Sequence, residues 1–276
     1  MGIIVGIDVG GSTTKIVGFD SGRLLPPELV KATDPIASVY GGFGKFTSSN
    51  GISLSDIDSV MMTGVGSSYI GNNIYGLDAV CVNEFKANGR GGLYLSGLDE
   101  AIVVSMGTGT AYVHANAQLD EYNYLGGTGV GGGTVVGLSD RILGMRSIEH
   151  IADLALQGDL SKIDLRISDI TESNIIPTLS SNATAANFGK LSDLASKEDL
   201  ALGIINMVYE TIGMMAVFAA RMKGLTDIVL IGNLTVLPQC KPLFDNLGKL
   251  FSMNFIIPKN SAYGTVIGAA LEKAER

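Results

Sequence analysis

Several residue types are scarce in this 276-residue sequence, and each scarcity argues against a class of protein. The two cysteines, Cys81 and Cys240, are too few and too isolated for a disulfide framework, a zinc site or an iron–sulfur site. The net charge of -8 and the absence of any lysine- or arginine-rich run argue against nucleic acid as a partner. No apolar segment reaches the roughly 18 uninterrupted residues of a membrane span, and no secretory signal pattern is visible. We therefore expect a cytoplasmic protein without a membrane partner.

Apolar residues make up 46% of the chain, which is long enough for two domains with separate cores. The opening reads as a strand (IIVGIDV), a tight turn (GGST) and a second strand (KIVGFD). Residues 101–115 repeat this unit as AIVVSMGTGTAYVHA. We interpret the repeat as a structural duplication with a boundary near residue 100. The predicted domains are residues 1–100 and residues 101–276.

Other segments predict an α/β protein. Residues 59–67 and 79–85 have the pattern of buried strands in a mainly parallel sheet. Apolar positions recur at three- and four-residue spacing from Ser196 to Met222, with a capping box at Ser196 and Asp199 and a stop at Gly224. This pattern predicts one long helix that is buried on several sides. A strand over 227–235 and a closing amphipathic helix from Gly264 follow it.

Three turns combine glycine with hydroxyl side chains: DVGGSTTK at 8–15, MGTGT at 106–110 and GGTGVGGGT at 126–134. Such turns bring backbone N–H groups close to an anion, although each alone also fits an ordinary hairpin. The sequence has neither the P-loop pattern GxxxxGK[ST] nor a Rossmann fingerprint. We predict that the turns together cradle phosphate. The candidate nucleotide-binding residues are Asp8, Gly10, Gly11, Ser12, Thr13, Lys15, Gly107, Thr108, Gly109, Thr110, Gly127, Thr128, Gly129 and Gly232.

Three charged residues fit phosphoryl-transfer chemistry. Asp8 ends the first strand, where a carboxylate is suited to hold Mg²⁺. Lys15 could neutralise a transferring phosphate, or could be a solvated strand residue. Glu84 lies at the predicted start of a helix after a buried run. There its carboxylate either interacts with the helix N-terminus or faces the ligand crevice as a general base.

Six stretches, GIDVGGSTTK, VNEFKANGRGGLYL, VSMGTGT, GGTGVGGGT, GDLSKIDLRISDI and NATAANFGK, resemble type II pantothenate kinases in order and spacing. That family belongs to the acetate and sugar kinase, Hsc70 and actin superfamily. The resemblance implies two related ribonuclease H-like (actin-like ATPase) domains around an ATP crevice. It also implies phosphorylation of pantothenate by Mg-ATP, the first step of coenzyme A biosynthesis, in a cytoplasmic homodimer built on the long helix. Coenzyme A is a candidate feedback ligand.

Carried over residue by residue, the resemblance makes Glu84 the catalytic base, Asp8 the metal residue and Lys15 a phosphate residue. Two departures concern the acceptor. The family usually has an arginine that pairs with the pantothenate carboxylate where this chain has Tyr124, and a serine where it has Ala111. Tyrosine cannot replace the charged, bidentate contact of arginine. Arg90 is a candidate replacement, and the predicted substrate residues are Glu84, Thr108, Tyr124 and Arg90.

Several functions remain open at this point. The departures favour a pantothenate relative without a free carboxylate, such as pantetheine, as an alternative acceptor. A sugar kinase of the same superfamily is another alternative, although no sugar-binding NDxxA-like stretch is found near residue 100. An ATPase that activates radical dehydratases would need bridging cysteines. A nucleotide-binding regulator without catalysis would bind ATP without turnover, and Glu84 argues against it.

Overall fold

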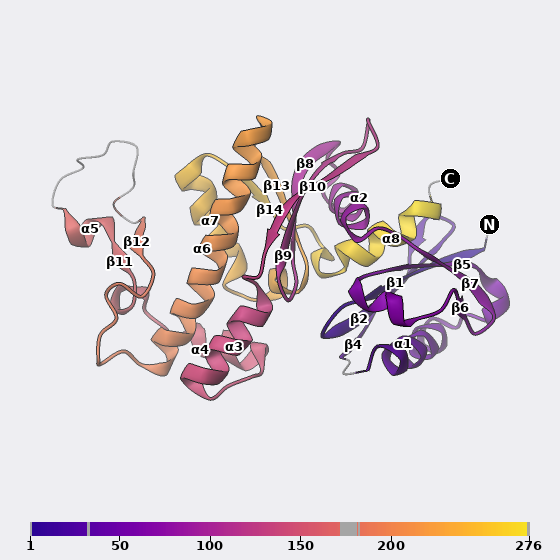
Figure 1. Ribbon diagram of the computed structural model, residues 1–276, viewed down its shortest axis with the longest axis horizontal. Coiled ribbons are helices and arrows are strands. Elements are labelled where there is room, and N and C mark those ends of the chain that lie inside the picture. The colour runs from indigo at the N-terminus through magenta and orange to yellow at the C-terminus, as the bar shows by residue number, and fades with distance from the viewer. Residues whose placement is uncertain (1, 32–33, 172–180, 182, 275–276) are drawn as a thin grey trace.

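Two mixed β-sheets with helices on their faces form the two halves of the chain (Figure 1). The computed structural model describes residues 2–31, 34–171, 181 and 183–274. The first sheet has the strand order β3-β2-β1-β5-β7-β6, with β4 also paired to β2. Its strands are β1 (Ile3–Val9), β2 (Thr13–Asp20), β3 (Arg23–Leu24), β4 (Glu28–Lys31), β5 (Ile57–Thr63), β6 (Asn73–Ile74) and β7 (Leu77–Cys81).

The first sheet is buried on both faces because successive strand residues point to opposite sides. Val5 and Ile7 on β1 face a core that includes Phe43 and Phe46 of α1 (Pro35–Asn50). Ile4 faces the other way and packs with the apolar residues of the last helix, α8 (Gly264–Ala274). The predicted hairpin is present, since β1 pairs antiparallel with β2 and parallel with β5.

The second sheet repeats this plan with the order β10-β9-β8-β13-β14. Its strands are β8 (Glu100–Met106), β9 (Thr110–Asn116), β10 (Glu121–Thr128), β13 (Asp227–Ile231) and β14 (Asn254–Ile256). The predicted hairpin of β8 and β9 is antiparallel, and β8 runs parallel to β13. The same hairpin-plus-parallel-strand unit therefore starts each sheet, as the predicted duplication requires.

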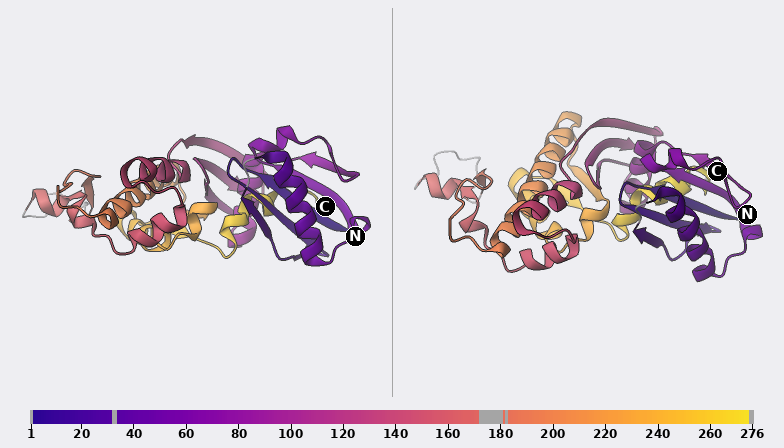
Figure 2. Two further views of the ribbon diagram at one scale, coloured as in Figure 1. Left: turned by 90° about the horizontal axis from the view of Figure 1, so that it is seen from below. Right: turned by 60° about the horizontal axis from the view of Figure 1, so that its bottom comes forward.

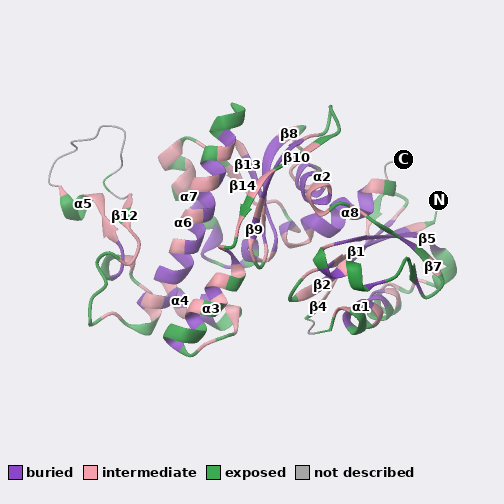
Figure 3. Cartoon of the chain, in the orientation of Figure 1, coloured by how far each residue is buried: buried purple, intermediate pink, exposed green. Residues whose placement is uncertain are grey.

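Helices α2 (Glu84–Ser96) and α6 (Lys197–Lys223) cover opposite faces of the second sheet. The Ser196 side chain accepts from the Asp199 amide, and Gly224 ends α6 with φ +70°. These features confirm the predicted caps. In length and composition α6 could span a membrane, but 61% of its most apolar window is buried inside the protein, as in a core helix (Figure 3).

The remaining elements lie beside α6 or beyond it. They are α3 (Gly132–Leu143), α4 (Ile148–Ala155), α7 (Cys240–Phe251), α5 (Ile167–Ile170) and the short pair β11 (Leu165–Arg166) and β12 (Thr184–Ala186). Short 3₁₀ turns are η1 (Leu54–Asp56), η2 (Val65–Tyr69), η3 (Leu160–Lys162), η4 (Asn233–Val236) and η5 (Ser261–Tyr263). 

Two helices exchange places between the halves. Helix α2 follows the first sheet in the chain but packs on β8, β9, β10 and β13, whereas α8 ends the chain and packs on β1, β2 and β5. Figure 2 shows the end of the chain reaching back beside the N-terminus. Helices α2 and α8 pack extensively against each other, so this pair joins the two halves.

One expected strand differs from the structure. Residues 79–85 were expected to form a buried strand, but β7 ends at Cys81, and Val80 on it is 52% exposed. The buried-strand expectation is wrong here because Val80 lies on the same face as its partner Met61, which α8 covers by packing on β1, β2 and β5, and β7 is at the border of that cover. Asn83 then caps α2 instead of continuing the strand.

Candidate active site

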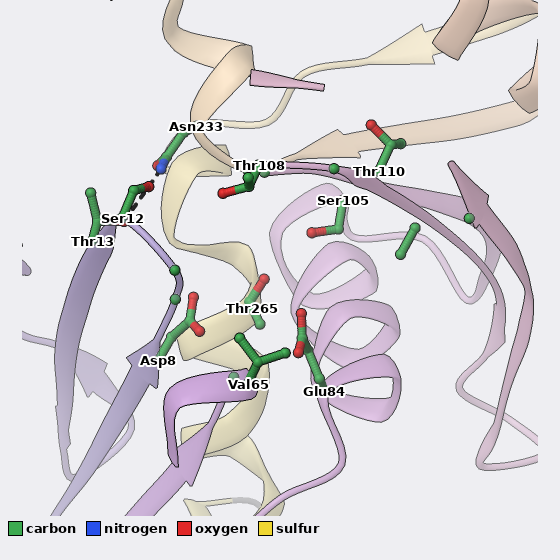
Figure 4. Close-up of a pocket in the computed structure, with 18 of the residues that line it drawn as sticks. Asp8, Ser12, Thr13, Val65, Glu84, Ser105, Thr108, Thr110, Asn233 and Thr265 are labelled. Carbon is green, nitrogen blue, oxygen red and sulfur yellow. Dashed lines mark hydrogen bonds between the residues drawn. The ribbon is translucent and has the colours of Figure 1, made fainter. Parts of the chain in front are cut away.

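A cleft of about 580 Å³ lies between the two halves and gathers the glycine turns (Figure 4). Every predicted nucleotide, metal and substrate residue except Arg90 lines it. The lining also includes residues that the sequence did not single out for the site: Gly64, Val65, Ser105, Asn233 and Thr265. Ala111, noted only as a departure, lines it as well.

The first glycine turn joins β1 to β2. Its Gly10 amide donates to the Thr13 carbonyl at 3.0 Å, which closes the hairpin. Asp8 and Lys15 are directly opposite each other in the antiparallel register. The hairpin therefore brings an acid and a base together at the floor of the cleft.

The second and third turns are bonded to each other. The Gly132 amide donates to the Gly107 carbonyl at 2.9 Å, and the Gly133 amide donates to the Thr108 carbonyl at 2.9 Å. The Thr110 hydroxyl donates to the Val130 carbonyl at 2.9 Å. Helix α3 begins at Gly132, within the third glycine stretch, so its positive N-terminal end adds to an anion-binding wall.

The turn after β13 completes this wall. Gly232 has φ +98°, and a Cβ there would lie 2.5 Å from the Met106 carbonyl oxygen, so this close approach requires glycine. The next residue, Asn233, donates from Nδ2 to the Thr13 hydroxyl at 3.4 Å. That bond links the second half to the first turn across the cleft.

The charged pair at the floor is desolvated. Burial raises the pKa of Asp8 to about 6, the positive charge of Lys15 opposes that rise, and the nearby Glu84 charge adds to it. Burial likewise lowers the pKa of Lys15, whose ammonium donates to the Ala262 carbonyl at 2.6 Å. Lys15 is buried, so the alternative of a solvated strand residue is wrong.

Glu84 faces Asp8 across the cleft from the first residue of α2 (Figure 4). Asn83 fixes this helix start, because its side-chain oxygen accepts from the Phe85 amide at 2.9 Å and the Lys86 amide at 3.1 Å. Burial raises the pKa of Glu84. A carboxylate with a raised pKa at a cleft wall is suited to take a proton from a bound hydroxyl.

The donor set fits Mg²⁺ held jointly with a nucleotide. Magnesium usually binds one or two carboxylates and completes its shell with water and phosphate oxygens. Asp8 supplies a carboxylate beside the glycine turns. No cluster of three or more acidic, histidine or cysteine residues that could hold a metal by itself occurs in the described part of the chain.

Space for the Asp8 carboxylate depends on Gly64, which follows β5. Gly64 has φ +88° and ψ 155°. A Cβ at this position would lie 2.6 Å from Asp8 Oδ1 and 2.6 Å from the Val9 carbonyl oxygen. Only glycine fits both this backbone conformation and this contact.

One aromatic residue, Tyr124, lines the predicted acceptor side of the cleft. The Tyr124 ring stacks on the Phe85 ring, with centroids 4.0 Å apart and planes 19° apart. Arg90 does not line the cleft, and its guanidinium donates to Glu272 on α8 at 2.6 Å. Lys15 is the one cation among the lining residues that the structure describes. We therefore leave Arg90 out of the acceptor site.

Comparison with known proteins gives a consistent result. Residues 92–240 match the model of the Fumble family. The type II pantothenate kinase of Oceanobacillus iheyensis is 29% identical over 278 residues, which cover 97% of this chain and 98% of the relative. The type II pantothenate kinase of Staphylococcus aureus strain USA300 is 29% identical over 295 residues, covering 98% and 99%.

Solved structures agree on the fold. Component A of (R)-2-hydroxyglutaryl-CoA dehydratase from Acidaminococcus fermentans aligns with a TM-score of 0.72 at 17% identity, over 100% of both chains. A ROK family glucokinase from Streptomyces griseus, in complex with glucose and AMPPNP, aligns with a TM-score of 0.64 at 13% identity, also over 100% of both chains. At these identities the likeness shows the fold alone, which is the predicted actin-like ATPase fold.

Proposed function

Because this chain belongs to the Fumble family, we propose that it is a kinase that transfers the γ-phosphoryl group of ATP to the hydroxyl group of pantothenate. The product is 4'-phosphopantothenate. One observation carries the proposal: three glycine turns, Asp8 and Glu84 converge on one cleft. Its relatives from Oceanobacillus and Staphylococcus, named as type II pantothenate kinases, support the choice of acceptor.

Each part of the cleft has a proposed task. The glycine turns bind the phosphates through backbone N–H groups, and Asp8 holds Mg²⁺ against them. Bound magnesium neutralises charge that develops on the phosphoryl oxygens. Glu84 accepts the proton of the acceptor hydroxyl, whose oxygen attacks the γ-phosphorus. The bond from this phosphorus to the bridging oxygen breaks, and ADP leaves.

Lys15 has a task that follows from its contacts. Its buried ammonium donates to the Ala262 carbonyl, and the charge of Asp8, its partner in the hairpin register, acts on it. We propose that it balances the Asp8 charge while the nucleotide is absent and lies near the phosphates when the nucleotide binds. This proposed role requires a buried lysine in a fixed position rather than one that extends into solvent.

A second acceptor class is favoured by the residues that line the cleft. Tyr124 lines the cleft with its ring stacked on Phe85, and Lys15, the single lining cation, already donates to the Ala262 carbonyl and lies opposite Asp8 in the hairpin. A carboxylate on the acceptor would have no cation of its own there. An uncharged pantothenate relative such as pantetheine is therefore the second candidate.

We further propose a homodimer that associates along α6. Met214, Phe218 and Met222 recur at four-residue spacing on one side of this helix. Phe218 is 60% exposed and Met222 is 69% exposed. Apolar side chains that line one exposed helix face are typical of a contact with a second subunit.

The domain boundary near residue 100, the cytoplasmic location and coenzyme A as a feedback ligand remain proposals from the sequence.

Measurement of ADP release with Mg-ATP tests the proposed acceptor, using pantothenate, pantetheine and glucose in separate reactions. Release with pantothenate, together with a product heavier by one phosphoryl group, supports the first candidate. A strong preference for pantetheine supports the second. ATP binding without turnover on any acceptor would favour the catalytically inactive regulator.

Cys240 is buried and Cys81 lies in the other half, which argues against a cluster-bridging activator ATPase.

A further inference from the structure

A buried hydrogen bond joins α2 and α8 directly beneath the cleft. The Thr265 hydroxyl, on the second residue of α8, donates to Asn88 Oδ1 on α2 at 2.7 Å. Thr265 is 8% exposed and lines the cleft, whereas Asn88 is fully buried. Figure 4 shows Thr265 between Asp8 and Glu84.

The two helices have little freedom elsewhere along their contact. A Cβ on Gly91 would overlap the Gly264 carbonyl, and a Cβ on Gly268 would overlap the Ala87 carbonyl, so the backbones touch. At the far end, Glu272 on α8 pairs with Lys86 and Arg90 on α2. The Thr265–Asn88 hydrogen bond is the polar contact between α2 and α8 at the end of their contact that lies next to the cleft.

This bond bears on the position of Glu84. Asn88 follows Glu84 by four residues, so both lie on the same side of α2, one turn apart. No hydrogen bond to the Glu84 carboxylate occurs within the described residues. Asn88 Nδ2 is buried without a hydrogen-bond partner there. The location of Glu84 is therefore set by the start of α2 itself, through the Asn83 cap and the bond from Asn88 to α8.

The metal residue and the general base of the proposed reaction belong to different halves of the protein. Asp8 belongs to the first sheet, on which α8 packs, and Glu84 begins the helix that packs on the second sheet. Any slip of α2 against α8 changes the separation between the phosphate-binding side and the base. A misplacement of about 1 Å between reacting groups can cost on the order of 100-fold in rate.

We propose that Thr265 and Asn88 are positioning residues whose hydrogen bond holds Glu84 at its working distance from the phosphate site. This inference rests on the proposed function, because it assigns a task relative to the base of that reaction. It predicts that kcat depends on the bond, whereas the KM for ATP does not. A bond that served stability alone would leave kcat unchanged in every variant that folds.

The test compares Thr265→Val, Thr265→Ser and the double variant Thr265→Val/Asn88→Leu with the native chain. Tyr112→Phe is the control, because Tyr112 is buried, does not line the cleft, and loses by this change a hydroxyl that donates to the Ile212 carbonyl at 3.1 Å. Each protein is assayed for kcat, the KM for ATP and the thermal midpoint. Basal hydrolysis of Mg-ATP, with water as the acceptor, is measured alongside.

We expect Thr265→Val to lower kcat on the order of 10-fold to 100-fold with an unchanged KM for ATP. Thr265→Ser keeps the hydroxyl and restores kcat. In the double variant the thermal midpoint recovers, because no buried partner is left unpaired, while kcat stays low. Tyr112→Phe loses stability but keeps kcat.

Two results would overturn the inference. One is a native kcat in Thr265→Val, and the other is a kcat that recovers together with the thermal midpoint in the double variant. Failure of the proposed function is a different result, namely no acceptor-dependent ADP release by the native chain. In that case basal hydrolysis decides the inference, which fails if hydrolysis is equal in the native chain and in Thr265→Val.

Discussion

Gly64→Ala is the substitution whose effect on the site follows most directly from the structure. It adds one methyl group at a residue with φ +88° and ψ 155°, a conformation that is almost confined to glycine. The added Cβ would lie 2.6 Å from Asp8 Oδ1. Ordinary van der Waals contact begins at 3.4 Å, so the carboxylate or the turn has to move by several tenths of an ångström.

Two costs can be separated in this variant. The backbone strain alone is about 1–3 kcal/mol of folding stability. Displacement of Asp8 acts on binding and rate instead, because a charge-assisted contact of a carboxylate is worth about 1.5–3 kcal/mol. That energy corresponds to a loss of about 10-fold to 100-fold in affinity for Mg-nucleotide.

Gly22→Ala is the matched control, since Gly22 has φ +81° and an added Cβ meets nothing within 4 Å. Chemical denaturation gives the stability of both variants, and isothermal titration gives their affinity for Mg-AMPPNP. We expect both to lose stability and Gly64→Ala alone to lose nucleotide affinity. Native affinity in a folded Gly64→Ala protein would refute the assigned role of Asp8.

Three other predictions follow from the site and the α6 surface. The pKa of Asp8 is raised to about 6, so the affinity for Mg-nucleotide should fall as the pH drops through 6 and the Asp8 carboxylate takes up a proton. Binding titrations at pH values across about 5–8 check this, and Asp8→Asn should remove the dependence of the affinity on pH. Tyr124→Arg should raise kcat/KM for pantothenate by about 10-fold to 100-fold and leave that for pantetheine unchanged, because it adds a cation beside the acceptor; equal gains on both acceptors would contradict this. Phe218→Glu should convert a dimer to a monomer in light scattering, whereas a native mass for this variant would place the interface elsewhere.

Local sequence signals predicted much of the fold. Hairpins at 8–15 and 106–110 depend on neighbouring residues only, as do the caps of α6 at Ser196 and Gly224, and the structure has all of them. The exposure of Val80 was not predicted because it depends on how far α8 extends over that face of the sheet. The exchange of α2 and α8 between the sheets was also missed, since periodicity indicates an apolar face but not what that face packs against.

Some residues of the candidate site could be predicted from the sequence, and others could not. Glycine-hydroxyl turns are visible in sequence, and the structure brings them into one cleft. Thr265 and Gly64 carry no such signal: the first is an ordinary threonine near a helix start, and the second matters through its distance from Asp8. Asn233 lies in the segment 227–235 that was predicted as a strand, and its contact with Thr13 across the cleft required the fold. The ion pair between Arg90 and Glu272 was equally invisible, because it joins residues from the two exchanged helices.

The most direct test of the account is a coupled ADP-release assay with Mg-ATP and pantothenate on the native chain and on Glu84→Gln. Loss of a general base costs about 100-fold to 10,000-fold in rate, and glutamine keeps the size of the side chain. We predict pantothenate-dependent release by the native chain, its loss in Glu84→Gln, and equal binding of Mg-AMPPNP by both proteins. Release that persists at the native rate in Glu84→Gln would contradict the assignment of Glu84 as the base.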